Sequence, residues 1–149
     1  MDGTLFELGT DGPSRILVGI DGTDSSMRAA AYAAGMARRQ GSHLIALYVA
    51  TTSPMAAQLA TTAAAMIQTQ AEIARQLRSA VEEGAKLVGV DAEFVLRRGN
   101  PYRELIAVAN ELRVDAVVVG ASGQSGRRFV GSLAGRLVRD ATWPITVVP

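Results

Sequence analysis

Short runs of branched apolar residues alternate with helix-forming stretches along this chain, and this alternation limits the possible folds more than any other feature of the sequence. Residues 15–20 and 43–50 are apolar over most of their length, a pattern typical of strands that are buried on both faces of a parallel sheet. Residues 91–98 alternate more in polarity, which indicates an edge strand. Two further strands are predicted at 115–119 and 144–148.

Helix signals occupy the intervals between these strands. The alanine-rich first helix ends at Gly41, a residue favoured just past a helix C-terminus, and a long second helical tract follows at 54–87. The third helix begins at Asn100 and Pro101, which suit the cap and the first helical position, and a short fourth is predicted at 133–141. This order predicts an α/β fold: a doubly wound five-stranded parallel sheet of order 3-2-1-4-5 with helices on both faces.

Composition adds limits on size, location and partners. With 149 residues, 48% of them hydrophobic, the chain can form one globular core, and we expect a flexible N-terminal extension at 1–13 and one domain at 14–149. A net charge of +1 provides no strong field for nucleic acid or a membrane surface. The sequence has no cysteine, no secretory signal pattern and no apolar run of bilayer length, so we expect a cytoplasmic protein without disulfides.

Two loops rich in Gly, Ser and Asp follow the first and fourth predicted strands, at 21–25 and 120–132. In a sheet of order 3-2-1-4-5 the switch point lies between these two strands, and ligands bind there at the carboxyl ends. Glycine lets backbone N–H groups approach an anion, and a helix N-terminus adds a favourable dipole. The sequence therefore predicts a phosphate-bearing ligand, with a nucleotide as the first candidate.

Several segments, in the same order, resemble the universal stress protein family: 16–26, 99–101, 119–123 with 131–132, and 144–149. The resemblance implies a regulatory protein of the stress response that binds ATP or another adenine nucleotide. In ATP-binding members nine residues separate the second glycine of the phosphate loop from a final glycine, whereas only seven separate Gly123 from Gly131 here. The shorter arc leaves open which adenine nucleotide fits.

The resemblance also implies roles for individual residues. Asp21 contacts the adenine or ribose edge, the backbone of Val49 reads the base, and Gly120 lies against the ribose and the first phosphate. Phosphate contacts are implied for four further residues: Gly123, Gly131, Ser132 and Leu133. Plain structural roles remain open beside these, namely a turn or cap for Asp21, turns for the glycines and an N-cap for Ser132.

The polar residues offer little for catalysis. Lys86, the only lysine, is far in sequence from the glycine loops, and no Ser-His-Asp or His-Glu-x-x-His set can be composed. His43, the only histidine, is expected to be structural. We therefore expect a binding protein without a metal site rather than an enzyme. One alternative is a ligand-independent member that acts through protein–protein contacts; another is a flavin-binding electron carrier, for which only Tyr48 is near enough to stack.

The last predicted strand, 144–148, lies at a sheet edge in the order 3-2-1-4-5. It carries no charge, and the unpaired N–H and C=O groups of such an edge invite another strand. Pro144 and Pro149 bracket it and limit further growth. We therefore expect a homodimer through twofold antiparallel pairing of this strand, as the resemblance also implies.

Overall fold

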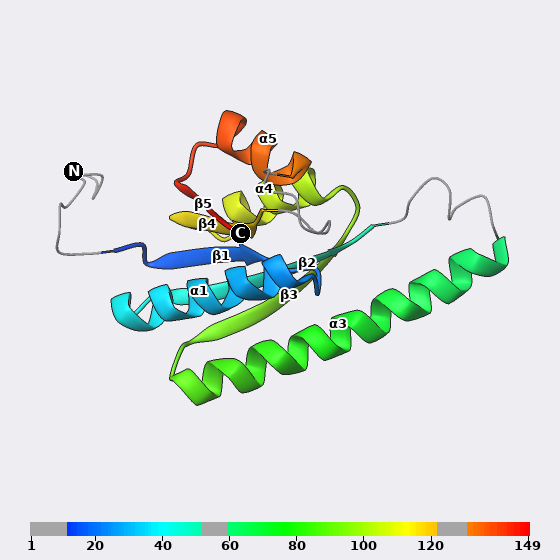
Figure 1. Cartoon of the computed structure of the whole chain (residues 1–149), viewed down its shortest axis with the longest axis horizontal. Coiled ribbons are helices and arrows are strands. Elements are labelled where there is room, and N and C mark those ends of the chain that lie inside the picture. Colours follow the sequence, from blue (N-terminus) through cyan, green and yellow to red (C-terminus); the bar gives the residue numbers. More distant parts are fainter. Residues whose placement is uncertain (1–11, 52–59, 122–130) are drawn as a thin grey trace.

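The computed structural model describes residues 12–51, 60–121 and 131–149, in which strands and helices alternate as predicted (Figure 1). The elements are β1 Arg15–Gly19, α1 Asp24–Gln40, β2 His43–Ala50, α3 Ala60–Val88, β3 Ala92–Arg98, α4 Pro101–Glu111, β4 Ala116–Gly120, α5 Ser132–Asp140 and β5 Ile145–Val148. Several bounds differ from the prediction by one residue: β1 ends at 19 rather than 20, and α5 begins at 132 rather than 133. Most of the predicted N-terminal extension lies outside the described residues, as do 54–59 of the predicted second helix.

The strands form one parallel sheet in the order β3-β2-β1-β4-β5, which confirms the predicted fold class. β1 and β2 start in register at Arg15 and His43. On its other side β1 pairs with β4, beginning at Ile16 and Ala116. This order makes β3 and β5 the outer strands and places β1 beside β4 at the switch point.

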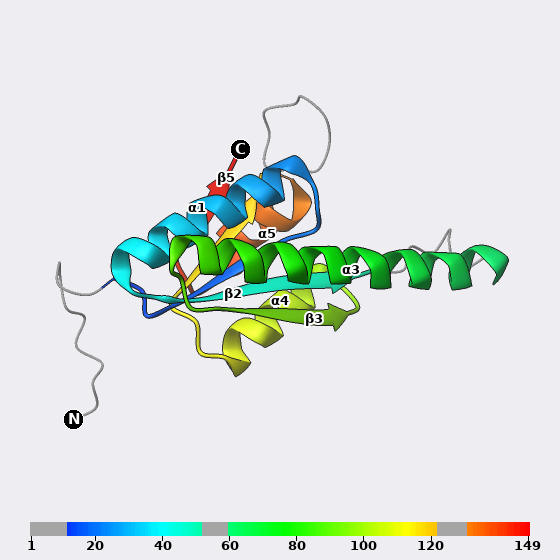
Figure 2. The same ribbon diagram turned by 90° about the horizontal axis from the view of Figure 1, so that it is seen from below.

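Helices cover both faces of the sheet: α1 and α3 lie on one face, and α4 and α5 on the other (Figures 1 and 2). Successive side chains of a strand point to opposite faces, so Ile16 and Val18 join the core under α1 and α3, whereas Leu17 joins the core under α4 and α5. All three are 0% exposed. Burial on both faces explains why the strand runs are continuously apolar.

Local chemistry sets the helix ends. Gly41, with φ 67°, ends α1 in the left-handed conformation that glycine adopts without steric cost. The Asn100 side chain accepts a hydrogen bond from Arg103 N at 3.0 Å and caps α4, with Pro101 as the first helical residue. Within the described ranges, no helix is both long and apolar enough to cross a bilayer.

Candidate functional site

A cavity of about 600 Å³ lies at the carboxyl ends of β1, β2 and β4, where the sheet order changes direction. Its walls also include the first turns of α1 and α5. Six of the seven predicted site residues line it: Asp21, Val49, Gly120, Gly131, Ser132 and Leu133. The seventh, Gly123, lies outside the described residues. The ends of both loops that were predicted to meet at the switch point thus border one cavity.

The unequal lengths of β1 and β2 create one wall of this cavity. The β1–β2 register ends at Gly19 and Leu47, whereas β2 stays paired with β3 as far as Ala50. Leu47 O accepts from Ile20 N at 2.8 Å on the β1 side, and Ala50 O accepts from Gly99 N at 3.1 Å on the β3 side. Because carbonyl directions alternate along a strand, the backbone N–H and C=O of Val49 point to the β1 side, beyond the end of β1. This backbone edge borders the cavity, where it can bind a flat polar ligand.

The loop after β1 is held by its own side chains. Asp21 Oδ1 accepts hydrogen bonds from Thr23 N at 3.0 Å and from Thr23 Oγ1 at 2.6 Å. Thr23 Oγ1 in turn accepts from Ser26 N at 3.3 Å, which makes Thr23 the N-cap of α1. Asp21 therefore has the turn-forming role that the sequence left open. A carboxylate has about four lone-pair sites, so this turn leaves acceptor capacity at the cavity.

Gly120 lies where β4 meets the first turn of α1. A Cβ atom on Gly120 would come within 2.8 Å of the Ser25 carbonyl carbon and of Ser26 N. Backbone atoms cannot yield to such a contact as a flexible side chain can. Glycine at this position therefore allows the end of β4 to lie against the start of α1, independently of any contact that it makes with a ligand.

The N-terminus of α5 forms another part of the cavity wall. Gly131 is the N-cap residue of α5, and Ser132 is therefore the first residue of the helix and not its cap. Glycine has no side chain that could bond to the first backbone N–H groups. Gly131 N donates to Ala121 O, which joins the start of α5 to the end of β4. The first backbone N–H groups of a helix lack intrahelical acceptors and carry a partial positive charge. Two helix N-termini, those of α1 and α5, thus border the same cavity.

Tyr48 contributes a buried phenol to the cavity wall and is 6% exposed. Burial raises the pKa of its hydroxyl, the negative charge of Asp21 raises it further, and the positive charge of Arg98 lowers it. The hydroxyl is therefore protonated at neutral pH and can donate a hydrogen bond.

The family model described as the universal stress protein family matches residues 13–149. This chain belongs to that family. The universal stress protein YxiE of Bacillus subtilis is 30% identical over 146 residues, which cover 91% of this chain and 98% of that protein. The solved structure of universal stress protein UspA from Lactobacillus plantarum has a TM-score of 0.74 at 23% identity, covering 91% of this chain and 97% of that one. A universal stress protein solved in complex with cAMP has a TM-score of 0.71 at 25% identity, covering 92% and 97%.

The cavity wall of this universal stress protein also includes polar residues that were not among the predicted site residues, among them Thr23, Ser26, Thr51 and Gln70. Thr23 could have been found, because a Thr between a buried strand and a helix-forming stretch is a favoured N-cap. Gln70 had no such signal. It lies in α3, and the rotation of that helix against β2 decides whether it reaches the cavity.

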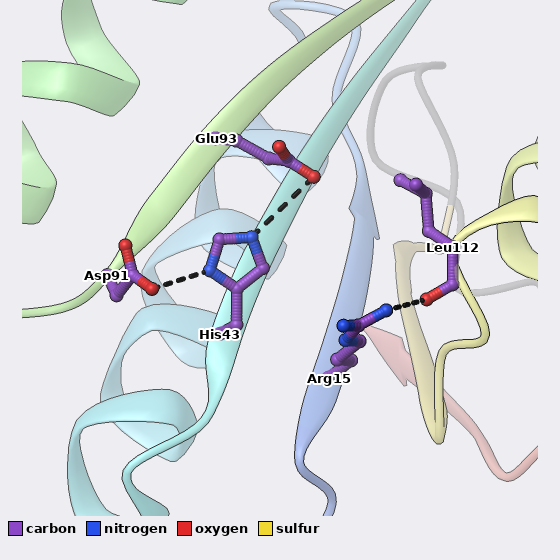
Figure 3. A network of polar contacts seen from close by, with 5 residues as sticks. All are labelled: Arg15, His43, Asp91, Glu93 and Leu112. Carbon is purple, nitrogen blue, oxygen red and sulfur yellow. Dashed lines mark hydrogen bonds and ion pairs between the residues drawn. The ribbon is translucent and has the colours of Figure 1, made fainter.

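A second polar cluster lies at the amino ends of the strands, away from the cavity (Figure 3). His43 Nδ1 is 2.9 Å from Asp91 Oδ2, and its Nε2 is 3.6 Å from Glu93 Oε1. Arg15 NH1 donates to Leu112 O at 2.7 Å. These contacts join β2 to β3 and β1 to the end of α4, as expected for a structural histidine. In the part of the chain that the structure describes, no group of three acidic or histidine side chains is arranged to hold a metal ion.

Proposed function

We propose that this universal stress protein is a regulatory protein that binds an adenine nucleotide in the cavity between the ends of β1 and β4. The observation that carries the proposal is the convergence of two helix N-termini and the unpaired edge of Val49 on one cavity of about 600 Å³. Helix N-termini attract phosphate, and the volume is within the usual range for a small-molecule site. The family member solved with cAMP supports an adenine nucleotide as the ligand.

The proposed contacts follow the walls of the cavity. Asp21 accepts a hydrogen bond from the ribose or base edge, and the backbone of Val49 pairs with the base. Gly120 lies against the ribose and the first phosphate. The phosphates face four residues of the second loop and of α5: Gly123, Gly131, Ser132 and Leu133.

We also propose that binding changes conformation or partner choice and is not followed by efficient turnover. The only lysine of the sequence, Lys86, belongs to α3, and the only histidine, His43, lies at the opposite end of the sheet. The cavity wall therefore has neither a phosphate-binding lysine nor a histidine base within the described residues. The seven residues between Gly123 and Gly131 give a shorter arc, which favours a shorter adenine nucleotide over ATP.

Calorimetric titration of ATP, ADP, AMP and cAMP tests this function in wild type and in two matched variants. Asp21→Asn keeps an oxygen for Thr23 but removes the charge that strengthens a hydrogen bond to ribose, so affinity should fall by about 1 kcal/mol, or fivefold. Asp24→Asn is the control, because Asp24 is exposed in the first turn of α1 and is not part of the cavity wall. Its affinity should stay equal or rise slightly.

Two other results of these titrations would contradict parts of the proposal. Equal binding by wild type and Asp21→Asn would remove Asp21 from the ligand site. If none of the four nucleotides binds wild type, the nucleotide function is wrong and the ligand-independent alternative takes its place. We further propose that residues 14–149 act as one domain in the cytoplasm and that two copies pair through β5.

A further inference from the structure

Gln70 is a polar residue in the apolar stripe of a helix. The buried face of α3 presents Ile73, Ala74, Leu77 and Val81 to the core under α1 and α3. Gln70 lies three residues before Ile73 and four before Ala74, on the same face, and is only 8% exposed. Buried polar side chains cost stability unless they are hydrogen-bonded, so this one calls for an explanation.

The carboxamide of Gln70 uses only part of its hydrogen-bonding capacity. Its Nε2 donates to the backbone oxygen of Thr51, just past the end of β2. A carbonyl oxygen can only accept, so this contact fixes which end of the amide faces Thr51. Oε1 is then a buried acceptor that has no hydrogen-bond partner among the described residues.

Gln70 also lies in the wall of the cavity, together with Thr51, Val49 and Tyr48. Its partner Thr51 is two residues from Val49, whose backbone edge faces the same cavity. The half-satisfied amide is thus bonded two residues from Val49, whose backbone is proposed to pair with the base.

We propose that Gln70 is a specificity-determining residue that accepts a hydrogen bond, through Oε1, from the exocyclic amino group of the bound base. This inference rests on the proposed nucleotide function. Oε1 is closed to solvent in the empty cavity, so pairing includes a turn of the amide about its last side-chain torsion, which has a broad energy profile. The ligand then supplies the donor that the protein lacks at this atom.

An acceptor at this position distinguishes adenine from guanine, because the two bases differ in the group that they present to it. Adenine presents an amino donor at the ring position where guanine presents a carbonyl oxygen. Facing Oε1, an amino group forms a hydrogen bond, whereas a carbonyl would place two acceptors against each other. The polar residue in the stripe of α3 thereby favours adenine over guanine.

A cycle of ligand and residue changes tests the pairing directly. The dissociation constants of AMP and of purine riboside 5′-monophosphate, which lacks the amino group, are measured by calorimetry for wild type and Gln70→Met. Methionine has a similar length and no acceptor of comparable strength. Gln68→Met is the matched control, since Gln68 is exposed on the same helix.

In wild type we expect AMP to bind more tightly than the analogue, and we expect the ratio of the two dissociation constants to change by about fivefold in Gln70→Met, the typical effect of one hydrogen bond. Gln68→Met should keep the wild-type ratio. Thermal unfolding of Gln70→Met should stay close to wild type, because the variant removes an unsatisfied acceptor as well as one hydrogen bond.

Three results would overturn the inference. If Gln70→Met keeps the wild-type ratio while still binding AMP, Oε1 does not contact the amino group, although the nucleotide function stands. If wild type binds AMP and the analogue equally, the protein does not recognise the amino group. If wild type binds neither, this inference is wrong, and the proposed function is wrong as well if ATP, ADP and cAMP also fail to bind.

Discussion

At the scale of single residues, a glycine can be required by the fold and still border a ligand site. Gly120 was predicted to lie against a ribose, and the structure gives it a second reason to be glycine: a Cβ atom at this position would lie only 2.8 Å from the backbone of Ser25 and Ser26. If a substitution of Gly120 abolished nucleotide binding, the loss could therefore come from the disturbed contact with α1 rather than from a lost ligand contact. For that reason the binding test above uses Asp21.

The steric role of Gly120 predicts a loss of stability on its replacement by alanine. Gly120→Ala forces the end of β4 away from α1 and should lower the free energy of unfolding by about 1–3 kcal/mol. Gly19→Ala is the matched control, since its Cβ would meet only side-chain atoms, Leu105 Cδ1 at 3.6 Å and Val119 Cγ1 at 3.7 Å. Urea unfolding of both variants checks this; equal stabilities would show that the α1–β4 contact yields without cost.

At the scale of elements, the backbone groups on the outer edge of β5 determine whether another strand can pair with the sheet. Val117 N donates to Pro144 O at 3.0 Å, and Ala121 N donates to Val148 O at 2.7 Å. The even-numbered residues of β5 therefore direct their backbone groups to β4, and alternation directs the N–H of Val147 to the open edge. If two copies pair through this edge, the N–H of Val147 is one of the donors.

Proline at position 147 should then separate the two copies without unfolding either. Val147→Pro removes an outward N–H and leaves the β4 ladder intact, so light scattering should change from about twice the 15.6 kDa chain mass to a single chain mass. Thr146→Pro is the contrasting variant, because it removes an N–H on the β4 side and should destabilise the fold. A dimer that survives Val147→Pro would place the interface on another surface.

At the scale of the whole molecule, the sequence was sufficient for the topology and insufficient for the finer geometry of the cavity. Strands buried on both faces are apolar throughout, so β1, β2 and β4 could be recognised from local composition, and the order of elements then limited the sheet to few arrangements. Register was not predictable in this way. That β2 extends beyond β1 and presents Val49 depends on contacts between distant segments.

The same limit applies to individual side chains in the cavity wall. Asp21 was expected at the switch point and lines the cavity, but its hydrogen bonds to Thr23 became visible only in three dimensions. Gln70 was not predicted because its neighbours along α3 say nothing about what lies across from that helix. Such residues are found by asking which buried polar atoms lack partners, a question that needs coordinates.

The most direct test of the central claim is to find which end of the sheet responds to a nucleotide. AMP is added to isotopically labelled protein, and backbone amide chemical shifts are followed by NMR. We predict that the amides of Val49, Ser132 and Leu133 shift in proportion to occupancy, while those of His43 and Asp91 at the opposite end stay unchanged. Shifts centred on His43 and Asp91, or none at saturating AMP, would contradict a nucleotide site between β1 and β4.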